Sequence, residues 1–170
     1  MTNNQILIIM KKVMFLLATL LIGGMMFTGC KKDNTPGSDP ASKTFKVSYA
    51  LGNKTTAALG IELVTSDCFK FDVTYTGANG EQVEVKGVTL PWTSPSIDVK
   101  APFKAKIEAK PVYDEAQLPD TFAYGAIPSI YKDNMEVKRG GEIANRTKVK
   151  FLEIMQESPE ELIMKAEYDF

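Results

Sequence analysis

The longest two-residue periodicity in the chain lies between residues 97 and 109. Its odd positions hold apolar side chains, whereas most even positions are charged: Ile97, Val99, Ala101, Phe103, Ala105, Ile107 and Ala109 alternate with lysines and acids. A β-strand directs successive side chains to opposite faces, so the pattern predicts one long strand with a dry face and a wet face. Pro102 lacks an N–H group, which predicts a sheet edge or a bulge at that point.

Shorter alternating segments predict further strands at residues 45–51, 69–75 and 83–88, with a turn at 77–80 between the last two. A strand over 121–131 is expected to be interrupted by Pro128. The Asp133-Asn134 turn should lead into another strand at 135–138.

Near the C-terminus, apolar side chains at even positions predict a final strand over Leu162–Phe170, although Ser158-Pro159-Glu160-Glu161 imitates a helix start. Residues 147–157 have apolar spacings of three and four, which predict one short helix. Residues 55–66 fit either a helical turn or a strand. We therefore expect a mainly β fold: an immunoglobulin-like two-layer β-sandwich with one short helix near the C-terminus.

One part of this β region resembles a known family. Val73-Thr-Tyr-Thr-Gly-Ala-Asn-Gly80, followed by Gly87-Val-Thr-Leu-Pro-Trp92, is similar to the mycobacterial membrane protein small family, which has an immunoglobulin-like domain. The resemblance implies the fold. It does not carry over that family's transporter accessory role, because one fold hosts many functions.

The N-terminal region has the pattern of an export signal. Lys11 and Lys12 precede Val13–Phe27, 15 residues without a charge, which is typical of a secretory signal peptide. As a helix this segment would rise only about 22 Å, less than the roughly 30 Å of a hydrocarbon core. An uncleaved anchor extended back through Ile6–Ile9 is the alternative, but the two lysines would interrupt it. Translation could start at Met1 or at Met10.

The end of that segment, Phe27-Thr28-Gly29-Cys30, resembles the lipobox of bacterial lipoproteins. The resemblance implies cleavage before Cys30, acylation of its thiol and new amino terminus, and attachment to membrane lipid. Lys31, directly after the cysteine, resembles the residue at that position in lipoproteins of the outer membrane. The domain could face the periplasm or the cell surface. The Lys-Lys-Asp start, like the chain as a whole, resembles small lipoproteins of gut Bacteroidota. We expect a signal peptide at 1–29, a polar flexible tether at 30–43 and the folded domain at 44–170.

Composition excludes several functions. The chain has no histidine, two cysteines and a net charge of −1. These numbers exclude His-based catalysis and Cys₄ zinc sites, and they argue against nucleic-acid binding. Cys68 is expected to be a packed small residue. The adjacent acids at 114–115 and 160–161 are expected to contact solvent, so we predict no catalytic residues, no metal and no cofactor.

Two features are weak candidates for ligand binding. The wet face of the predicted long strand carries Lys100, Lys104, Lys106 and Lys110. These lysines could give solubility and protect an edge, or form a cationic stripe for acidic polysaccharide or lipid head groups. Trp92, the only tryptophan, could pack in the core or form an exposed platform for stacking a sugar.

Together these observations favour a lipid-anchored outer-membrane protein that acts as a non-catalytic binding or accessory module, with a glycan or a protein as its possible partner. The first alternative is a pilus-like or assembly subunit that lends Leu162–Phe170 or Phe45–Leu51 to a neighbour. The second is a hydrolase with an acidic site.

Overall fold

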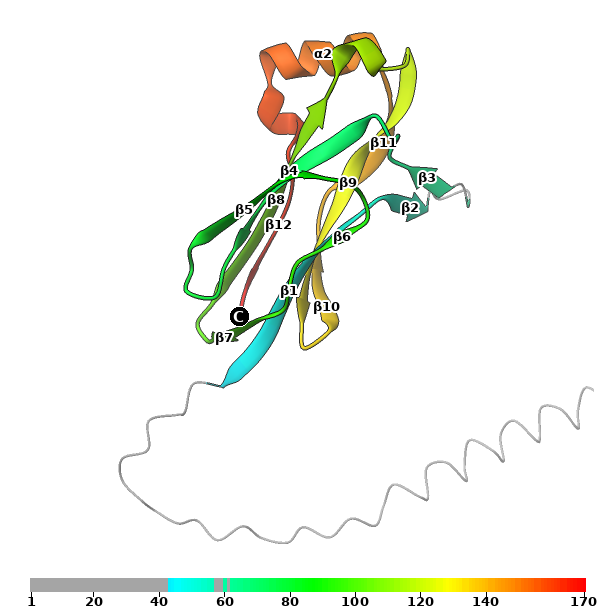
Figure 1. The fold of residues 1–170 in the computed structure, drawn as a ribbon. Helices are drawn as coiled ribbons and strands as arrows, with labels where there is room; N and C mark the ends of the chain where they lie inside the picture. Colours follow the sequence, from blue (N-terminus) through cyan, green and yellow to red (C-terminus); the bar gives the residue numbers. More distant parts are fainter. Residues whose placement is uncertain (1–42, 57–59, 61) are drawn as a thin grey trace, which may run out of the picture. The chain divides into compact units, whose positions relative to one another are not determined.

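The computed structural model describes residues 43–56, 60 and 62–170 (Figure 1). The predicted signal peptide, Cys30 and all of the tether except Lys43 lie outside the described residues. Within the described residues the fold consists of two antiparallel sheets, a separate two-stranded hairpin, one α-helix and two 3-10 helices.

The first sheet has the order β10-β9-β1-β6, with β11 pairing with β9 and β7 pairing with β1. Its strands are β1 (Thr44–Gly52), β6 (Trp92–Thr93), β7 (Ile97–Lys100), β9 (Thr121–Lys132), β10 (Met135–Arg139) and β11 (Glu142–Thr147).

The second sheet has the order β12-β8-β4-β5. Its strands are β4 (Phe69–Thr76), β5 (Gln82–Val88), β8 (Lys104–Tyr113) and β12 (Met164–Asp169). The remaining elements are the hairpin of β2 (Lys54–Thr56) and β3 (Glu62–Val64), the helix α2 (Lys148–Glu157), and the 3-10 helices η1 (Glu115–Gln117) and η2 (Pro159–Leu162).

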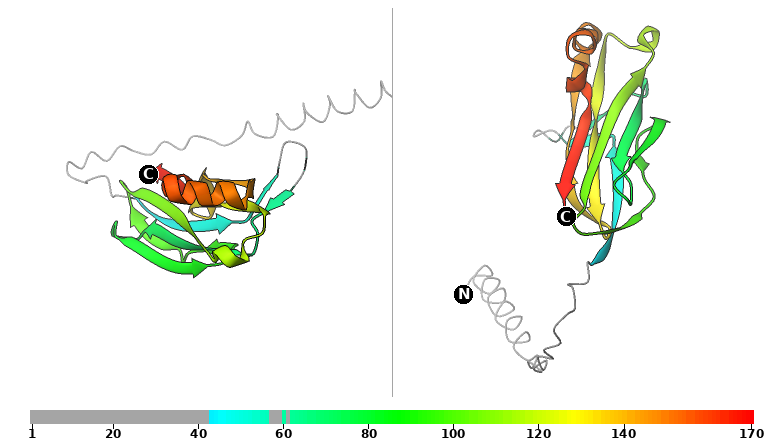
Figure 2. Two further views of the ribbon diagram at one scale, coloured as in Figure 1. Left: turned by 90° about the horizontal axis from the view of Figure 1, so that it is seen from above. Right: turned by 90° about the vertical axis from the view of Figure 1, so that its left-hand side faces the viewer.

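The two sheets pack face to face, and the core lies between them (Figure 2). Each sheet contributes its inward side chains, such as Tyr49 and Leu51 from β1 and Phe71 and Ile107 from the second sheet, all without exposed surface. The rings of Tyr49 and Tyr75 lie 4.9 Å apart across the interface. The prediction of a mainly β, two-layer fold with one helix near the C-terminus is confirmed.

The first-named strands agree closely with the structure. The predicted strands at 45–51 and 69–75 correspond to β1 and β4, and the return strand is β5. In the turn between β4 and β5, Gly77 N–H donates to the Glu81 carbonyl at 2.7 Å. Gly80 has φ +83 there, a conformation that favours glycine.

The prediction of a single long strand over 97–109 is wrong. The chain forms β7, which pairs with β1 in the first sheet, and then β8, which pairs with β4 and β12 in the second. Ala101 and Pro102 are exposed in the link between them. Because the inner faces of the two sheets look toward each other, odd residues can point inward before and after the crossing. The alternation therefore continues across a change of sheet.

The expected interruption at Pro128 is also wrong, because β9 runs without a break from Thr121 to Lys132. On one side, β9 pairs with β11 as far as Ala126 and with β10 from Ser129 onward. Pro128 lies between these two partners, where a missing N–H donor removes no bond of either ladder.

The prediction of a final strand over Leu162–Phe170 is wrong at its start, because the Ser158-Pro159 pattern begins a 3-10 helix there. The strand β12 starts at Met164, and Leu162 instead closes the 3-10 helix η2, which has Pro159 in its first turn. Of residues 55–66, for which the sequence allows a helical turn or a strand, Thr55 and Thr56 lie in β2 and Glu62–Val64 forms β3. The strand β11 was not predicted.

The helix α2 confirms the prediction for residues 147–157. Thr147 caps its start, with Oγ1 accepting from Lys150 N–H at 3.3 Å. Phe151 is fully buried, and its ring contacts those of Tyr113, Phe122 and Tyr124 edge to face. The helix therefore closes one end of the sandwich, called the far end below (Figure 1). Among the described residues, no helix is long and apolar enough to cross a membrane.

Candidate functional site

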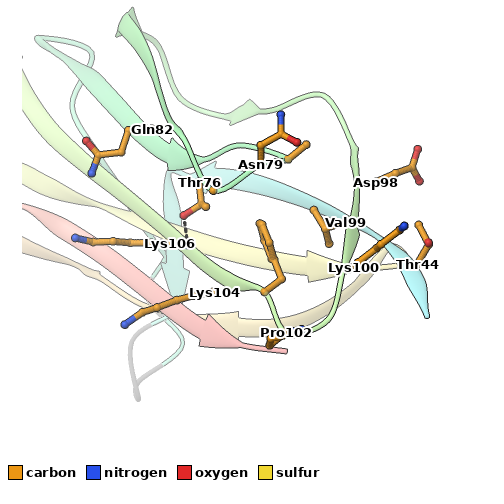
Figure 3. A pocket seen from close by; sticks show the side chains of 13 residues that line it. Thr44, Thr76, Asn79, Gln82, Asp98, Val99, Lys100, Pro102, Lys104 and Lys106 are labelled. Atoms are coloured by element: carbon orange, nitrogen blue, oxygen red, sulfur yellow. Dashed lines mark hydrogen bonds between the residues drawn. The ribbon is translucent and has the colours of Figure 1, made fainter. Parts of the chain in front are cut away.

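A hollow of about 830 Å³ lies where the chain passes from β7 to β8. Lys100, Lys104 and Lys106 all line it, together with Thr44 at the start of β1 (Figure 3). We call it the lysine hollow. The three candidate lysines therefore border one hollow from two sides: Lys104 and Lys106 extend from the second sheet in one direction, and Lys100 extends from the first sheet in the other (Figure 3). Lys110, further along β8, does not line it.

Residues from several elements shape the lysine hollow. The turn between β4 and β5 brings Asn79, and the start of β5 brings Gln82. The inner wall is apolar, since Val99 and Phe103 line it and are only 2% and 9% exposed. Thr76 Oγ1 accepts from the backbone N–H of Lys106 at 3.1 Å, which joins the ends of β4 and β8.

The charges around the lysine hollow are unequal. Lys104 Nζ lies 3.4 Å from Glu167, and Lys106 Nζ lies 2.9 Å from Glu108 and 3.8 Å from Glu167. The Lys106 ammonium donates to the Glu108 carboxylate, and this bond raises the pKa of Lys106 above its usual value. These exposed pairs are screened by water and contribute little to stability.

Lys100 differs from the other two lysines. It is exposed, and no carboxylate of the described residues lies within 4.0 Å of its Nζ. Its nearest acidic neighbour in sequence, Asp98, is bound instead to Lys46 at 2.9 Å. Lys100 is therefore the cation of the hollow best able to meet an anionic group from outside.

The lysine hollow can bind but has few groups for chemistry. An apolar wall with a small number of amide, hydroxyl and ammonium groups is the usual composition of a ligand pocket. Asp98 is its only lining carboxylate among the described residues, and it is already paired. Across the described part of the chain, no cluster of three or more His, Cys, Asp or Glu side chains could hold a metal ion.

Trp92 is separate from the three lysines. It pairs with Leu51 in the first sheet, and its ring lies 5.9 Å from that of Tyr75 in the second. Since residues opposite each other in a sheet point to the same face, Trp92 follows Leu51 toward the core. This geometry favours the packing interpretation over the sugar platform. Trp92 also borders a smaller hollow of about 250 Å³.

That smaller hollow contains a polar network that the sequence analysis missed. Arg139 Nε and Nη2 donate to the two carboxylate oxygens of Glu136, each at 3.0 Å, and Tyr131 Oη lies 3.3 Å from Glu136. The Arg139 guanidinium holds the pKa of Glu136 below its usual value. In a regular strand, residues three apart face opposite sides. A bulge between Glu136 and Lys138 changes this alternation and brings the two side chains together.

The other titratable residues considered from the sequence have local roles. Cys68 is a half-buried free thiol, and burial raises its pKa, which disfavours the reactive thiolate. Asp114 caps η1 by accepting from Ala116 N–H at 3.0 Å. Glu160 and Glu161 are exposed in η2. The acid pair at 114–115 thus caps and begins η1, and the pair at 160–161 lies within η2.

No protein-family model matches the chain, and no curated protein matches it either.

Proposed function

We propose that this protein is a lipid-anchored outer-membrane lipoprotein that acts as a non-catalytic binding or accessory module, and that the lysine hollow is its binding surface. The observation that carries the proposal is the placement of Lys100 on one side and of Lys104 and Lys106 on the other side of one hollow with an apolar wall (Figure 3). Cationic groups beside amide and hydroxyl groups fit a ligand that carries a negative charge.

The anchoring part of the proposal comes from the sequence. The Phe27-Thr28-Gly29-Cys30 segment resembles a lipobox, and a chain acylated at Cys30 would hold the domain to a membrane. Two or more acyl chains give stable attachment, because each buried CH₂ group contributes about 0.8 kcal/mol. The ligand's negative charge would come from an acidic polysaccharide or a lipid head group.

The strand-exchange alternative has less support from the arrangement of strands. Residues 45–51 lie within β1, which pairs with β9 on one side and with β6 and β7 on the other. Residues 164–169 pair with β8 along their whole length. Lending either strand to a neighbour would break a ladder that is already complete.

Two measurements test the proposal. The first compares wild-type cells with a Cys30→Ser variant, using membrane fractionation and the intact mass of the purified protein. We expect the wild type to carry acyl groups and to fractionate with the outer membrane. The variant should remain as unprocessed precursor or appear as soluble protein. Normal membrane fractionation of Cys30→Ser would contradict the lipobox interpretation.

The second measurement titrates the mature protein in neutral detergent with polygalacturonate, an acidic polysaccharide, by calorimetry. The double variant Lys100→Gln/Lys104→Gln should bind at least about fivefold more weakly than wild type, as expected for about 1 kcal/mol of charge-assisted contact. Lys148→Gln/Lys150→Gln removes two lysines at the far end and is the matched control. Equal losses in both double variants would show that binding does not depend on the lysine hollow.

A further inference from the structure

The lysine hollow lies at the end of the sandwich where the chain enters the domain. Thr44, the first residue of β1, is part of its lining. The next residue, Phe45, has its ring 4.9 Å from that of Phe170, the last residue of the chain. We call this the tether end; it is opposite to the end closed by α2 (Figure 1).

The predicted tether limits how far the domain can move from its anchor. Between Cys30 and Thr44 there are 43 − 30 = 13 residues. Fully extended, 13 residues span at most about 45 Å. If Cys30 is acylated, Thr44 at the lysine hollow stays within about 45 Å of the lipid head groups. The effective concentration of these head groups at the hollow is therefore high.

The two ends of the domain differ in charge. The far end carries seven acids in or beside η1, α2 and η2, against Arg146, Lys148 and Lys150: Asp114, Glu115, Asp120, Glu153, Glu157, Glu160 and Glu161. Around the lysine hollow at the tether end, six lysines are nearly balanced by five carboxylates: Lys43, Lys46, Lys100, Lys104, Lys106 and Lys132 against Asp98, Glu108, Asp133, Glu167 and Asp169. A negatively charged surface would therefore repel the far end more strongly than the tether end, which orients the domain.

Aromatic rings adjoin the lysine hollow at the tether end. Phe103 lines the hollow, and its ring lies 6.3 Å from that of Phe170. Lys132 Nζ lies 4.5 Å from the ring centre of Phe45 and 5.5 Å from that of Phe170. Tyr168, 4.8 Å from Phe170, is 37% exposed. Phe45 and Phe103 are buried, so Tyr168 and the half-buried Phe170 are the rings of this group that could meet a lipid surface. Tyrosine is enriched where proteins cross the membrane–water interface.

We propose that the tether end docks on the anionic phospholipid head groups of the membrane that holds Cys30, with lipid phosphates bound at the lysine hollow. This inference rests on the proposed function and names the source of its anionic ligand. Lys100 meets a phosphate directly, because it has no carboxylate partner among the described residues. Lys104 and Lys106 exchange part of their contact with Glu167 for lipid oxygens.

The test measures how fast single lysines are acetylated in the mature acylated protein held in vesicles. One vesicle preparation contains phosphatidylcholine alone, and the other also contains phosphatidylglycerol. Mass spectrometry of peptides gives the rate at each lysine. We expect Lys100 and Lys104 to react about fivefold more slowly in the anionic vesicles, because an anionic surface holds a nearby lysine with about 1 kcal/mol. Lys148 and Lys150 are internal controls and should react equally in both preparations.

Salt and substitution provide matched controls. In about 1 M NaCl, where the Debye length is about 3 Å, the protection at Lys100 and Lys104 should disappear. Lys100→Glu should abolish the protection of Lys104 in anionic vesicles. Lys148→Glu, which changes charge at the far end, should leave it intact.

The outcomes separate this inference from the proposed function. Equal rates in both vesicle types, together with protection by polygalacturonate, would overturn membrane docking but keep an anion-binding hollow. Membrane docking would also be overturned, and an anion-binding hollow kept, if free glycerol phosphate at millimolar concentration protected the lysines as well as anionic vesicles do. Equal rates under every condition would overturn both, and so would a mature chain whose intact mass shows no acyl group.

Discussion

The crossing from β7 to β8 predicts different effects of the same substitution at two odd positions of the alternating segment, residues 101 and 105. Ala101 and Ala105 have the same parity in the alternating segment, so the sequence pattern alone treats both as buried. In the structure Ala101 is exposed in the link, whereas Ala105 in β8 has no exposed surface. Serine is close to alanine in size, so replacing each by serine tests burial with little change in volume.

The expected difference is measurable. A hydroxyl buried at Ala105 without a partner should cost about 1–3 kcal/mol, while Ala101→Ser at the surface should stay within about 0.5 kcal/mol. Urea unfolding of a small domain has a slope of about 1–3 kcal/mol per molar. A loss of about 2 kcal/mol would therefore lower the midpoint by roughly 1 M. Ile107→Ala, at a fully buried position of the same strand, should cost about 2–5 kcal/mol and sets the scale.

Urea denaturation followed by circular dichroism would decide the matter. If Ala101→Ser lowered the midpoint as much as Ala105→Ser, residue 101 would be inside the core. The change of sheet at this point would then be refuted in favour of one continuous strand.

Three further predictions concern the core, a surface pair and the domain limits. Phe103→Ala should cost up to about 3–5 kcal/mol of unfolding free energy, whereas Lys104→Ala should stay within about 1 kcal/mol, as for exposed ion pairs; similar midpoints in urea would contradict the inward position of Phe103. Because Arg139 lowers the pKa of Glu136 in the folded state, the pair stabilises the fold above the usual glutamate pKa near 4.5. This stabilisation is lost as the pH falls through the lowered folded-state value. Glu136→Gln should remove that acid-dependent part, less than about 1 kcal/mol for a pair this exposed, and identical pH profiles of thermal unfolding would disprove it. Residues 44–170 alone should give a soluble monomer in gel filtration, and aggregation would mean that the tether or a partner contributes to the fold.

Much of the fold could be predicted because most buried strands show their alternation in the sequence. β1, β4 and β8 have buried side chains at every second position. Thr147 marks the start of α2. Alternation reports which face a residue occupies but not which sheet it belongs to. This is why the crossing after Lys100 was missed.

The candidate site was predictable only in part, for a related physical reason. The three lysines were identified from one alternating segment, and in the structure they border one hollow from two sides (Figure 3). Their neighbours Thr76, Asn79 and Gln82 come from a different hairpin, so only tertiary structure assigns them to the site. The Glu136–Arg139 pair depends on a bulge that has no clear sequence signal.

The contact between Phe45 and Phe170 means that the domain starts and finishes at one point in space. Neighbouring termini are what circular permutation needs. A short linker from Phe170 to Thr44, with new ends opened in the Asp133-Asn134 turn, would keep every strand ladder of the two sheets. It would remove only the covalent connection between β9 and β10. In such a permuted chain a lipid anchor fused to the new N-terminus would still leave from the same end of the sandwich. Opening the chain beside α2 would invert the domain on its anchor. Attachment geometry can thus be reversed without altering a single side chain of the core.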